Sequence, residues 1–292
     1  MAPLLFVNEL AYANAPGRPS KCTKPGAHIC AIYHLAFSGK PAIIIIVRRN
    51  EGKPLINKIK EVKKMNVLII DTETANCVEQ PLPYDIGYQV VNSSTGEVLV
   101  SRSFVVAEIF LDKELMSSAY FAEKVPQYWE QIKQGKRTIK KLLNIRRILW
   151  ADMKRFNCYK VGAYNMGFDK RATNNDTRYI TASFLRWFFP YKTEYFCIWN
   201  MACTSILKTP AFISFAERHN FISDCGNVKT SAEIAYRFIT NNPAFIEEHT
   251  GLEDVEIERE IYMKIIRSGL AFNDAVKYNC WREVQKYRKN QE

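Results

Sequence analysis

Residues 67–74, Val-Leu-Ile-Ile-Asp-Thr-Glu-Thr, join a run of apolar side chains to two carboxylates. A short continuous apolar run closed by polar residues is typical of a buried central strand. Side chains alternate between the faces of a strand, so Asp71 and Glu73 leave the same face and can converge on one cation. The pair alone is weak evidence, because the same pattern more often forms a capped turn.

Composition predicts a folded chain with one sizeable core, since 47% of its 292 residues are hydrophobic and 13% are aromatic. The formal net charge of +11 would ordinarily indicate a nucleic acid or an anionic membrane surface as partner. Residues 1–64 carry +8 of that charge, which leaves only +3 for residues 65–292. A nucleic-acid function must therefore rest on the chemistry of a site rather than on bulk charge.

Cysteine usage and hydropathy favour a cytoplasmic protein without a membrane partner. The eight cysteines lack the short regular spacing of a disulfide framework, which indicates a reducing compartment. The apolar run Ile43–Val47 is far too short to span a bilayer. The first fifteen residues lack a positive leader and contain Glu9, so a secretory signal is not expected.

Residues 1–64 show neither sustained helical nor strand periodicity, whereas an orderly pattern begins at Met65. The tripeptide Lys60-Glu61-Val62 can be encoded by a bacterial ribosome-binding sequence at a suitable distance before Met65. We therefore predict a poorly structured extension that is translated upstream DNA, with a basic extension that helps to hold nucleic acid as the alternative. The expected organisation is an extension at 1–64, a catalytic domain at 65–270 and a basic, exposed helical tail at 271–292.

The pattern from Met65 onward predicts a mixed α/β layer fold. Two β-rich runs at 85–92 and 97–106 are joined by Asn-Ser-Ser-Thr-Gly, a hairpin signal with glycine in the turn. Further strands are expected at 159–164 and 193–197. Helical periodicity is expected at 126–134 and 138–157, after Asp169, and at 199–208, 210–219 and 230–240.

A further helix is predicted to begin at Thr250. Thr250-Gly251-Leu252-Glu253 fits a capping box, in which a hydroxyl and a carboxylate satisfy each other's free amides. Asp254 then falls in the first turn and heads a stripe of isoleucines, so it should point inward with that stripe. Asp169, at a predicted strand-to-helix junction, can equally be an acid that suits the helix dipole. His249 alone would more often be an exposed loop histidine.

Together and in this order, these residues resemble the DEDD (DnaQ-like) exonuclease superfamily in its histidine-containing DEDDh branch. The three motifs are Ile69–Thr74 (IIDTET), Tyr164–Asp169 (YNMGFD) and His249–Asp254 (HTGLED). The resemblance covers about residues 65–267 and is greatest to phage-borne members from Gram-positive bacteria. It departs from the family after motif one, where Ala75-Asn76 replaces the common Thr-Gly and can change a tight turn. It implies a ribonuclease-H-like mixed sheet with flanking helices.

The resemblance also implies a site that contains two Mg²⁺ or Mn²⁺ ions. In such a site Asp71 bridges the ions, Glu73 and Asp254 complete the shell of the first, and Asp169 holds the second largely through water. Hard cations suit carboxylate oxygens, and a pair of them can hydrolyse an anionic phosphodiester near neutral pH. His249 would take the proton of the attacking water.

The implied activity is 3′→5′ exonucleolytic hydrolysis of single-stranded nucleic-acid 3′ ends, with DNA favoured, releasing nucleoside 5′-monophosphates. A role in proofreading with a DNA polymerase, or in phage DNA metabolism, would be compatible with it. Two alternatives remain: an exoribonuclease, which depends on contacts to the 2′-hydroxyl, and a catalytically silent nucleic-acid-binding scaffold. Gathered acids repel one another and argue against the scaffold.

Weaker signals concern contacts to the substrate. Four residues beside the acids are expected to touch the terminal sugar or base: Thr72, Thr74, Asn165 and Phe168. A dense aromatic stretch can either stack unpaired bases or, as its density favours, form core beneath a loop. Its members are Phe184, Trp187, Phe188, Phe189, Tyr191 and Tyr195.

Overall fold

A computed structural model describes residues 28–37, 40–48, 54–56, 65–181 and 186–291, and the chain divides into two units, Met1–Lys63 and Lys64–Glu292. In the first unit three strands form an antiparallel sheet in the order β1-β2-β3: β1 (His28–Phe37), β2 (Lys40–Arg48) and β3 (Pro54–Ile56). The sequence had not predicted these strands. How much of residues 1–64 is structured stays a prediction, because the rest of that range lies outside the described residues.

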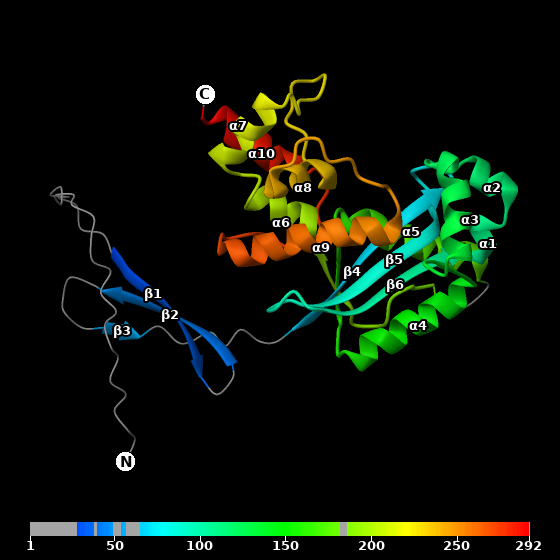
Figure 1. Ribbon diagram of the computed structural model, residues 1–292, viewed down its shortest axis with the longest axis horizontal. Helices are drawn as coiled ribbons and strands as arrows, with labels where there is room; N and C mark the ends of the chain where they lie inside the picture. Colours follow the sequence, from blue (N-terminus) through cyan, green and yellow to red (C-terminus); the bar gives the residue numbers. More distant parts are fainter. Residues whose placement is uncertain (1–27, 38–39, 49–53, 57–64, 182–185, 292) are drawn as a thin grey trace, which may run out of the picture. The chain divides into compact units, whose positions relative to one another are not determined.

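A six-stranded mixed sheet forms the centre of the second unit (Figure 1). Its order is β7-β6-β5-β4-β8-β9. The strands are β4 (Asn66–Ala75), β5 (Leu82–Asn92), β6 (Val98–Val106), β7 (Thr138–Lys140), β8 (Lys160–Ala163) and β9 (Glu194–Cys197). β4, β5 and β6 form an antiparallel meander, and β8 and β9 add in parallel on the other side of β4. This arrangement, with flanking helices, confirms the predicted ribonuclease-H-like fold.

The hairpin between β5 and β6 forms where the sequence places it. The side chain of Asn92 accepts hydrogen bonds from the backbone N–H groups of Ser94 and Thr95, and Gly96 has φ +82°. A positive φ costs a glycine little because it has no Cβ. The turn residues thus fix the register in which β6 returns beside β5.

The helices of this unit include the predicted ones, with one correction, and three short ones between residues 107 and 124 that were not predicted. They are α1 (Ala107–Phe110), α2 (Lys113–Ser117), the 3-10 helix η1 (Ala122–Lys124), α3 (Val125–Lys133), α4 (Leu142–Arg155), α5 (Met166–Ile180), α6 (Ile198–Thr204), α7 (Pro210–Arg218), α8 (Ala232–Thr240), α9 (Gly251–Ser268) and α10 (Trp281–Lys289). The helix expected over 138–157 starts only at Leu142. Thr138–Lys140 instead pairs in parallel with Phe104–Val106 at the sheet edge, a partnership that local periodicity cannot indicate.

Two hydrophobic layers sandwich the sheet. Leu68 and Ile70 join the core beneath α4, whereas Val67 and Ile69 join the core beneath α9 and α6. Figure 1 shows α9 and α4 on opposite sides of the sheet. Because side chains alternate along a strand, Asp71 continues the series that faces α9. The alternation that buries the apolar side chains of β4 therefore also directs its acidic side chains toward the α9 side of the sheet.

The C-terminal segment packs onto the second core. The backbone carbonyl of Asp274 accepts a hydrogen bond from the N–H of Cys197 at 3.0 Å, and Lys160 forms an ion pair with Asp274. In α10, Val284 is fully buried, so one side of the expected exposed tail is covered. The domain boundary near 270 stays a prediction. Among the described residues, none of the helices has the length and apolar character needed to cross a membrane.

Candidate active site

The first two acids lie at the end of β4, where the apolar run gives way to polar residues. Asp71 pairs with Gly87 of β5 and is partly exposed, while Glu73 pairs with Asp85 and is buried. A register shift falls between Glu73 and Thr74. Such a bulge bends a strand and re-aims the side chains beside it.

The turn after motif one has the left-handed backbone conformation that glycine adopts readily. Asn76, at the position where the family commonly has glycine, has φ +69°. Asparagine tolerates this left-handed region better than most residues. Its amide donates to the carbonyl of Gln80 at 3.0 Å, and its backbone N–H donates to the hydroxyl of Ser118 at 2.9 Å. The departure from the family pattern therefore does not remove the turn.

Asp169 reaches the site from the first turn of α5 and is buried. The helix follows Asn165, which adopts a left-handed conformation with φ +79°. The hydroxyl of Thr72 donates a hydrogen bond to Asp169 Oδ1 at 2.9 Å. This contact links motif one to motif two. The Thr72 hydroxyl, which we expected to touch the substrate, is thus engaged in holding the acid.

Asp254 is positioned by a close approach between α9 and β5. A Cβ on Gly87 would lie 2.3 Å from the carbonyl carbon of Gly251, a distance that excludes any side chain. The backbone N–H of Gly251 donates to Asp85 Oδ2 at 2.8 Å. Glycine at both positions lets α9 start directly on the sheet, and this brings the buried Asp254 beside the β4 acids.

The predicted capping box at Thr250 does not form. The Thr250 side chain makes no cap hydrogen bond and instead donates to the Glu253 carboxylate at 2.7 Å. Glu253 is also paired with Arg137, which forms a buried ion pair with Asp85. The long-range arginine therefore takes the carboxylate that the box required, and Asp85 supplies the acceptor at the helix start.

His249 lies on the loop before α9 with its side chain 39% exposed. Its ring stacks on Phe121, with centroids 4.4 Å apart and planes inclined by 10°. The backbone at His249 is left-handed, with φ +50°, which only a well-supported position tolerates. Burial and the positive charge of Lys124 lower the pKa of the imidazole. At neutral pH this histidine is therefore mainly neutral and able to accept a proton.

One cavity of about 470 Å³ collects these side chains. Of the predicted residues it is lined by Asp71, Thr72, Glu73, Asn165, Phe168, Asp169, His249 and Asp254. Thr74 is the exception: it pairs with Pro83 beyond the bulge and does not line the cavity. Residues separated by more than 180 positions in the chain thus share one site.

Sequence reasoning missed several lining residues, which are Tyr164, Trp199, Thr230, Ser231, Ala232, Glu247 and Glu258. Glu258 had a recognisable signal, because it lies one helical turn after Asp254 on the stripe that faces inward. Glu247, two residues before His249, had none beyond its proximity to that motif. Tyr164 fixes one wall through its hydroxyl, which donates to the carbonyl of Thr230 at 2.7 Å.

Burial raises the pKa of every carboxyl group that lines the cavity, and for all of them except Asp169 neighbouring carboxylates add to the rise. The values are about 7 for Asp169 and Glu247, about 8 for Glu73 and about 9 for Asp254, and lie well above the usual range for Asp71 and Glu258. At Asp169 the hydrogen bond from Thr72 opposes the rise. Crowded buried acids of this kind ionise together only when positive charge is supplied.

The donor set fits a hard divalent cation. Ligand atoms of Glu73, His249 and Asp254 all lie within 4.8 Å of one another. Asp254 Oδ1 and Glu258 Oε2 are buried and have no hydrogen-bond partner among the residues that the structure describes. Carboxylate oxygens are the ligands that Mg²⁺ and Mn²⁺ prefer. The residues present therefore fit the metal that the motif pattern implies.

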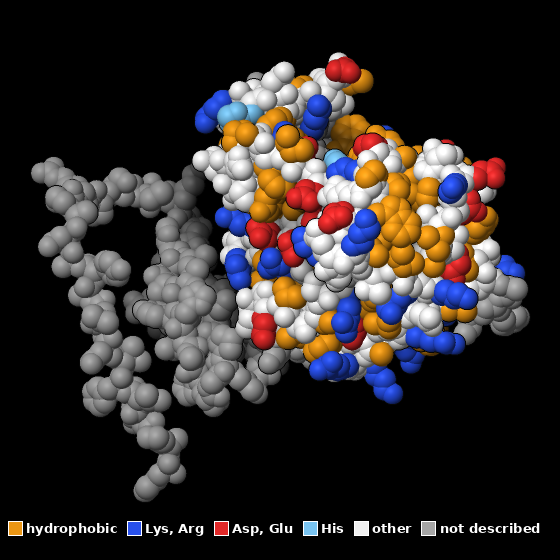
Figure 2. Space-filling view, turned by 45° about the vertical axis from the view of Figure 1, so that its right-hand side comes forward, with side chains coloured by type: hydrophobic (Ala, Val, Ile, Leu, Met, Phe, Trp, Pro, Cys, Tyr) orange, Lys and Arg blue, Asp and Glu red, His pale blue; other side chains and the backbone are white. Residues whose placement is uncertain are grey.

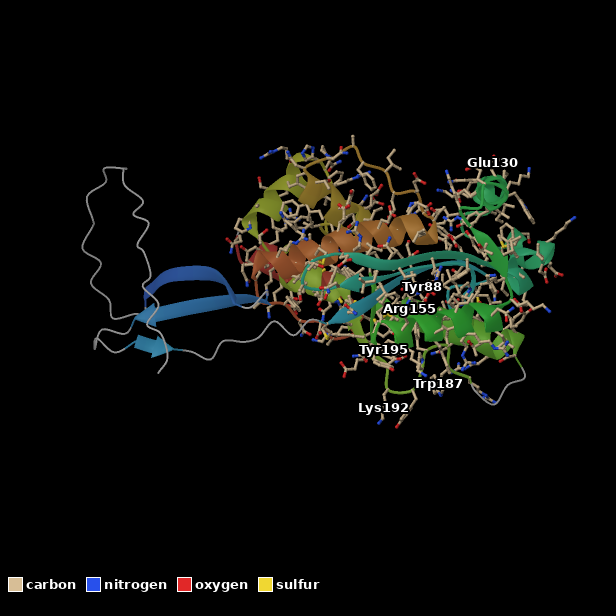
Figure 3. The ribbon with its side chains drawn as sticks, turned by 60° about the horizontal axis from the view of Figure 1, so that its bottom comes forward. Tyr88, Glu130, Arg155, Trp187, Lys192 and Tyr195 are labelled. Atoms are coloured by element: carbon tan, nitrogen blue, oxygen red, sulfur yellow. The ribbon has the colours of Figure 1, made fainter. Side chains whose placement is uncertain are left out.

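The aromatic stretch after α5 divides between core and surface. Phe188 and Phe189 are buried in the core beneath α4, as the favoured interpretation expected, and Phe184 lies outside the described residues. Trp187 is 59% exposed and Tyr191 88% exposed. Figure 3 shows Trp187 on the side of the sheet that carries α4, away from α9. None of the described members of the stretch lines the cavity.

Surface charge on the visible face is mixed. Figure 2 shows Lys and Arg side chains spread among acidic and hydrophobic ones, with several along the lower edge. This agrees with the small net charge of residues 65–292. Specific binding of an anionic substrate would therefore depend on the cavity.

No known family model matches the chain, and no curated protein matches it. Among solved structures, E. coli exonuclease I with a dA16 oligonucleotide aligns over 69% of this chain and 41% of its own, at 13% identity and a TM-score of 0.40. A product-bound exonuclease I aligns over 70% and 46%, at 13% identity and a TM-score of 0.45. The nuclease domain of 3′hExo, a DEDDh family member bound to rAMP, aligns over 73% and 98%, at 13% identity and a TM-score of 0.39.

This chain thus spans less than half the length of the exonuclease I chains that it resembles.

Proposed function

We propose that this chain is a metal-dependent 3′→5′ exonuclease of the DEDDh type. One observation carries the proposal: three motifs from distant parts of the chain bring Asp71, Glu73, Asp169, His249 and Asp254 to the wall of one cavity. A pure binding scaffold would gain nothing from burying mutually repelling carboxylates. A hydrolase needs them to concentrate positive charge.

Asp71, Glu73, Asp169 and Asp254 would hold two divalent ions, Mg²⁺ or Mn²⁺. When bound, such ions neutralise the phosphodiester and lower the pKa of a water molecule. The four acids supply the hard oxygen ligands and fix where that charge lies. Thr72 keeps Asp169 in place through its hydrogen bond.

His249 would act as the general base. Its lowered pKa leaves the ring free to take a proton from the attacking water, and the stack on Phe121 limits its rotation. The water oxygen forms a bond to the terminal phosphorus while the bond from phosphorus to the 3′-oxygen breaks. That oxygen takes up a proton and remains on the shortened strand as a 3′-hydroxyl. The product is a nucleoside 5′-monophosphate.

Asn165 and Phe168 line the cavity beside the motif-two acid and would contact the terminal nucleotide. Unpaired ends fit best, because a single terminal nucleotide must enter a cavity of about 470 Å³. We favour single-stranded DNA as the substrate and the cytoplasm as the location. A DNA polymerase would be the partner in proofreading or phage DNA metabolism.

Matched single-stranded DNA and RNA oligonucleotides of the same sequence test this function. We expect shortening with Mg²⁺ or Mn²⁺, none after EDTA treatment, and a faster rate on DNA. Faster shortening of RNA would identify an exoribonuclease. Binding of both strands without shortening under any metal would favour the silent scaffold and contradict the proposal.

A further inference from the structure

Glu258 is a buried acid of α9 that the five motif residues do not include. Its side chain is nearly fully buried, with 2% of the residue exposed. Oε1 accepts a hydrogen bond from the backbone N–H of Tyr164 at 2.8 Å, which fixes the carboxyl group at the end of β8. Oε2 is buried and has no hydrogen-bond partner in the described part of the chain. Within the described residues no Lys, Arg or His forms an ion pair with it.

Burying a carboxylate oxygen without a hydrogen-bond partner costs free energy. We therefore expect Glu258 Oε2 to bind a partner that the described residues do not supply. Among the residues that line the cavity, two further side-chain oxygens share this condition, Asp254 Oδ1 and Asn165 Oδ1. All three residues line the same cavity. These three unpaired oxygens, two near the starts of helices and one inside a helix, thus face the same cavity. A cation bound there would pair with all three.

The neighbours of Glu258 distinguish it from the group around His249. Glu73, His249 and Asp254 gather their ligand atoms within 4.8 Å of one another, and Glu258 is not a member of that group. The hydrogen bond from Tyr164 holds the Glu258 carboxyl group at the end of β8, one residue before Asn165, after which α5 starts. Asp169 lies in the first turn of α5, and β8 pairs with β4, the strand that carries Asp71. Glu258 therefore lies on the side of the cavity that carries Asp71 and Asp169.

We propose that Glu258 is a fifth carboxylate ligand, which holds the second divalent ion together with Asp71 and Asp169. The inference rests on the proposed two-ion exonuclease and adds a residue to its site. Without Glu258, that ion would be held by the bridging Asp71 and, largely through water, by Asp169. A further anionic oxygen close by would give the second ion another direct protein ligand. The hydrogen bond from Tyr164 holds that ligand in a fixed orientation.

The competing explanation is structural, with Glu258 serving only as an acceptor for the Tyr164 N–H. The Glu258→Gln variant distinguishes the two explanations. Its amide carbonyl preserves the acceptor for the Tyr164 N–H and the shape of the side chain, but it cannot provide an anionic ligand. Glu256→Gln is the matched control, since Glu256 is exposed on the same helix.

The experiment is a titration of the full chain with Mn²⁺, carried out with and without thymidine 5′-monophosphate. Calorimetry measures binding, and electron paramagnetic resonance measures the free Mn²⁺. We expect two bound ions for the wild type and for Glu256→Gln. In Glu258→Gln the weaker site should lose at least about tenfold in affinity, as loss of even an indirect ligand contact can cause. The tighter site should change little.

Unchanged affinity at both sites in Glu258→Gln would overturn the inference and leave the proposed exonuclease intact. A wild type that binds no Mn²⁺ and shortens no strand would instead refute the proposed function. Circular dichroism checks folding. If Glu258→Gln does not fold, Glu258→Asp replaces it: the charge stays but the carboxylate retracts by one methylene, so the weaker site should weaken, and unchanged affinity would again refute the inference.

Discussion

Replacing His249 by alanine tests the proposed chemistry at its most specific residue. The pKa of His249 lies below its ordinary value of about 6.5, so at about pH 7.5 the side chain is mainly neutral and able to accept a proton. The variant should therefore lose the whole contribution of a general base, about 10²- to 10⁴-fold in kcat. KM should change little, because four carboxylates remain to bind metal.

The assay is release of mononucleotide from a 3′-labelled single strand under saturating Mg²⁺, between about pH 5.5 and 9. In the wild type the acid limb should follow an ionisation below about 6.5, and in His249→Ala that limb should flatten. Added imidazole should restore part of the rate. His219→Ala is the matched control, since His219 packs between Phe215 and Phe221 and does not line the cavity. An unchanged rate and pH profile in His249→Ala would refute the assignment.

Three further predictions concern the support of the site. Phe121→Leu removes the face-to-face stack on His249, worth about 0.5–1.5 kcal/mol, and should lower kcat by roughly 2- to 12-fold at constant KM; an unchanged kcat would show that the stack is incidental. Burial raises the pKa of Glu73 to about 8 and of Asp254 to about 9, above their unfolded values, so these groups stabilise the fold most at acid pH and lose that contribution as pH rises through those values. The Tm of the metal-free protein should fall between about pH 5 and 9, and Mg²⁺ should restore it most at the alkaline end; a Tm that rises with pH after EDTA treatment would contradict this sign. Gly87→Ala would place a Cβ 2.3 Å from a backbone carbon of α9 and should lower the free energy of unfolding by at least about 1–3 kcal/mol in urea titrations, whereas wild-type stability would show that α9 can move away.

The sequence pattern was sufficient to predict those parts of the structure that depend on interactions between residues close together in the chain. The alternation along β4 predicted that Asp71 and Glu73 face one side, and the structure places both on the cavity wall. The hairpin before Val98 followed from its turn residues. Each of these inferences uses only the period of a strand or the chemistry of a short turn.

Predictions from the sequence were wrong where contacts with residues distant in the chain determine the local structure. Thr138–Lys140 forms a strand because β6 offers an open edge, and Thr250 loses its capping box because Arg137 binds Glu253. The position of Glu258, one helical turn after Asp254, was a signal in the sequence, but its contact with Tyr164 and its place in the cavity depend on residues distant in the chain. Such tertiary contacts override local preference.

Product analysis on wild-type protein and Asp71→Ala tests the central claim most directly. A single strand labelled at its 3′ end should release all label as nucleoside 5′-monophosphate in Mg²⁺, and a 5′-labelled copy should shorten one nucleotide at a time. Asp71→Ala should release almost none, whereas Asp224→Ala, at an exposed aspartate outside the cavity, should match the wild type. Near wild-type release by Asp71→Ala, or release of label first from the 5′ end, would contradict the account.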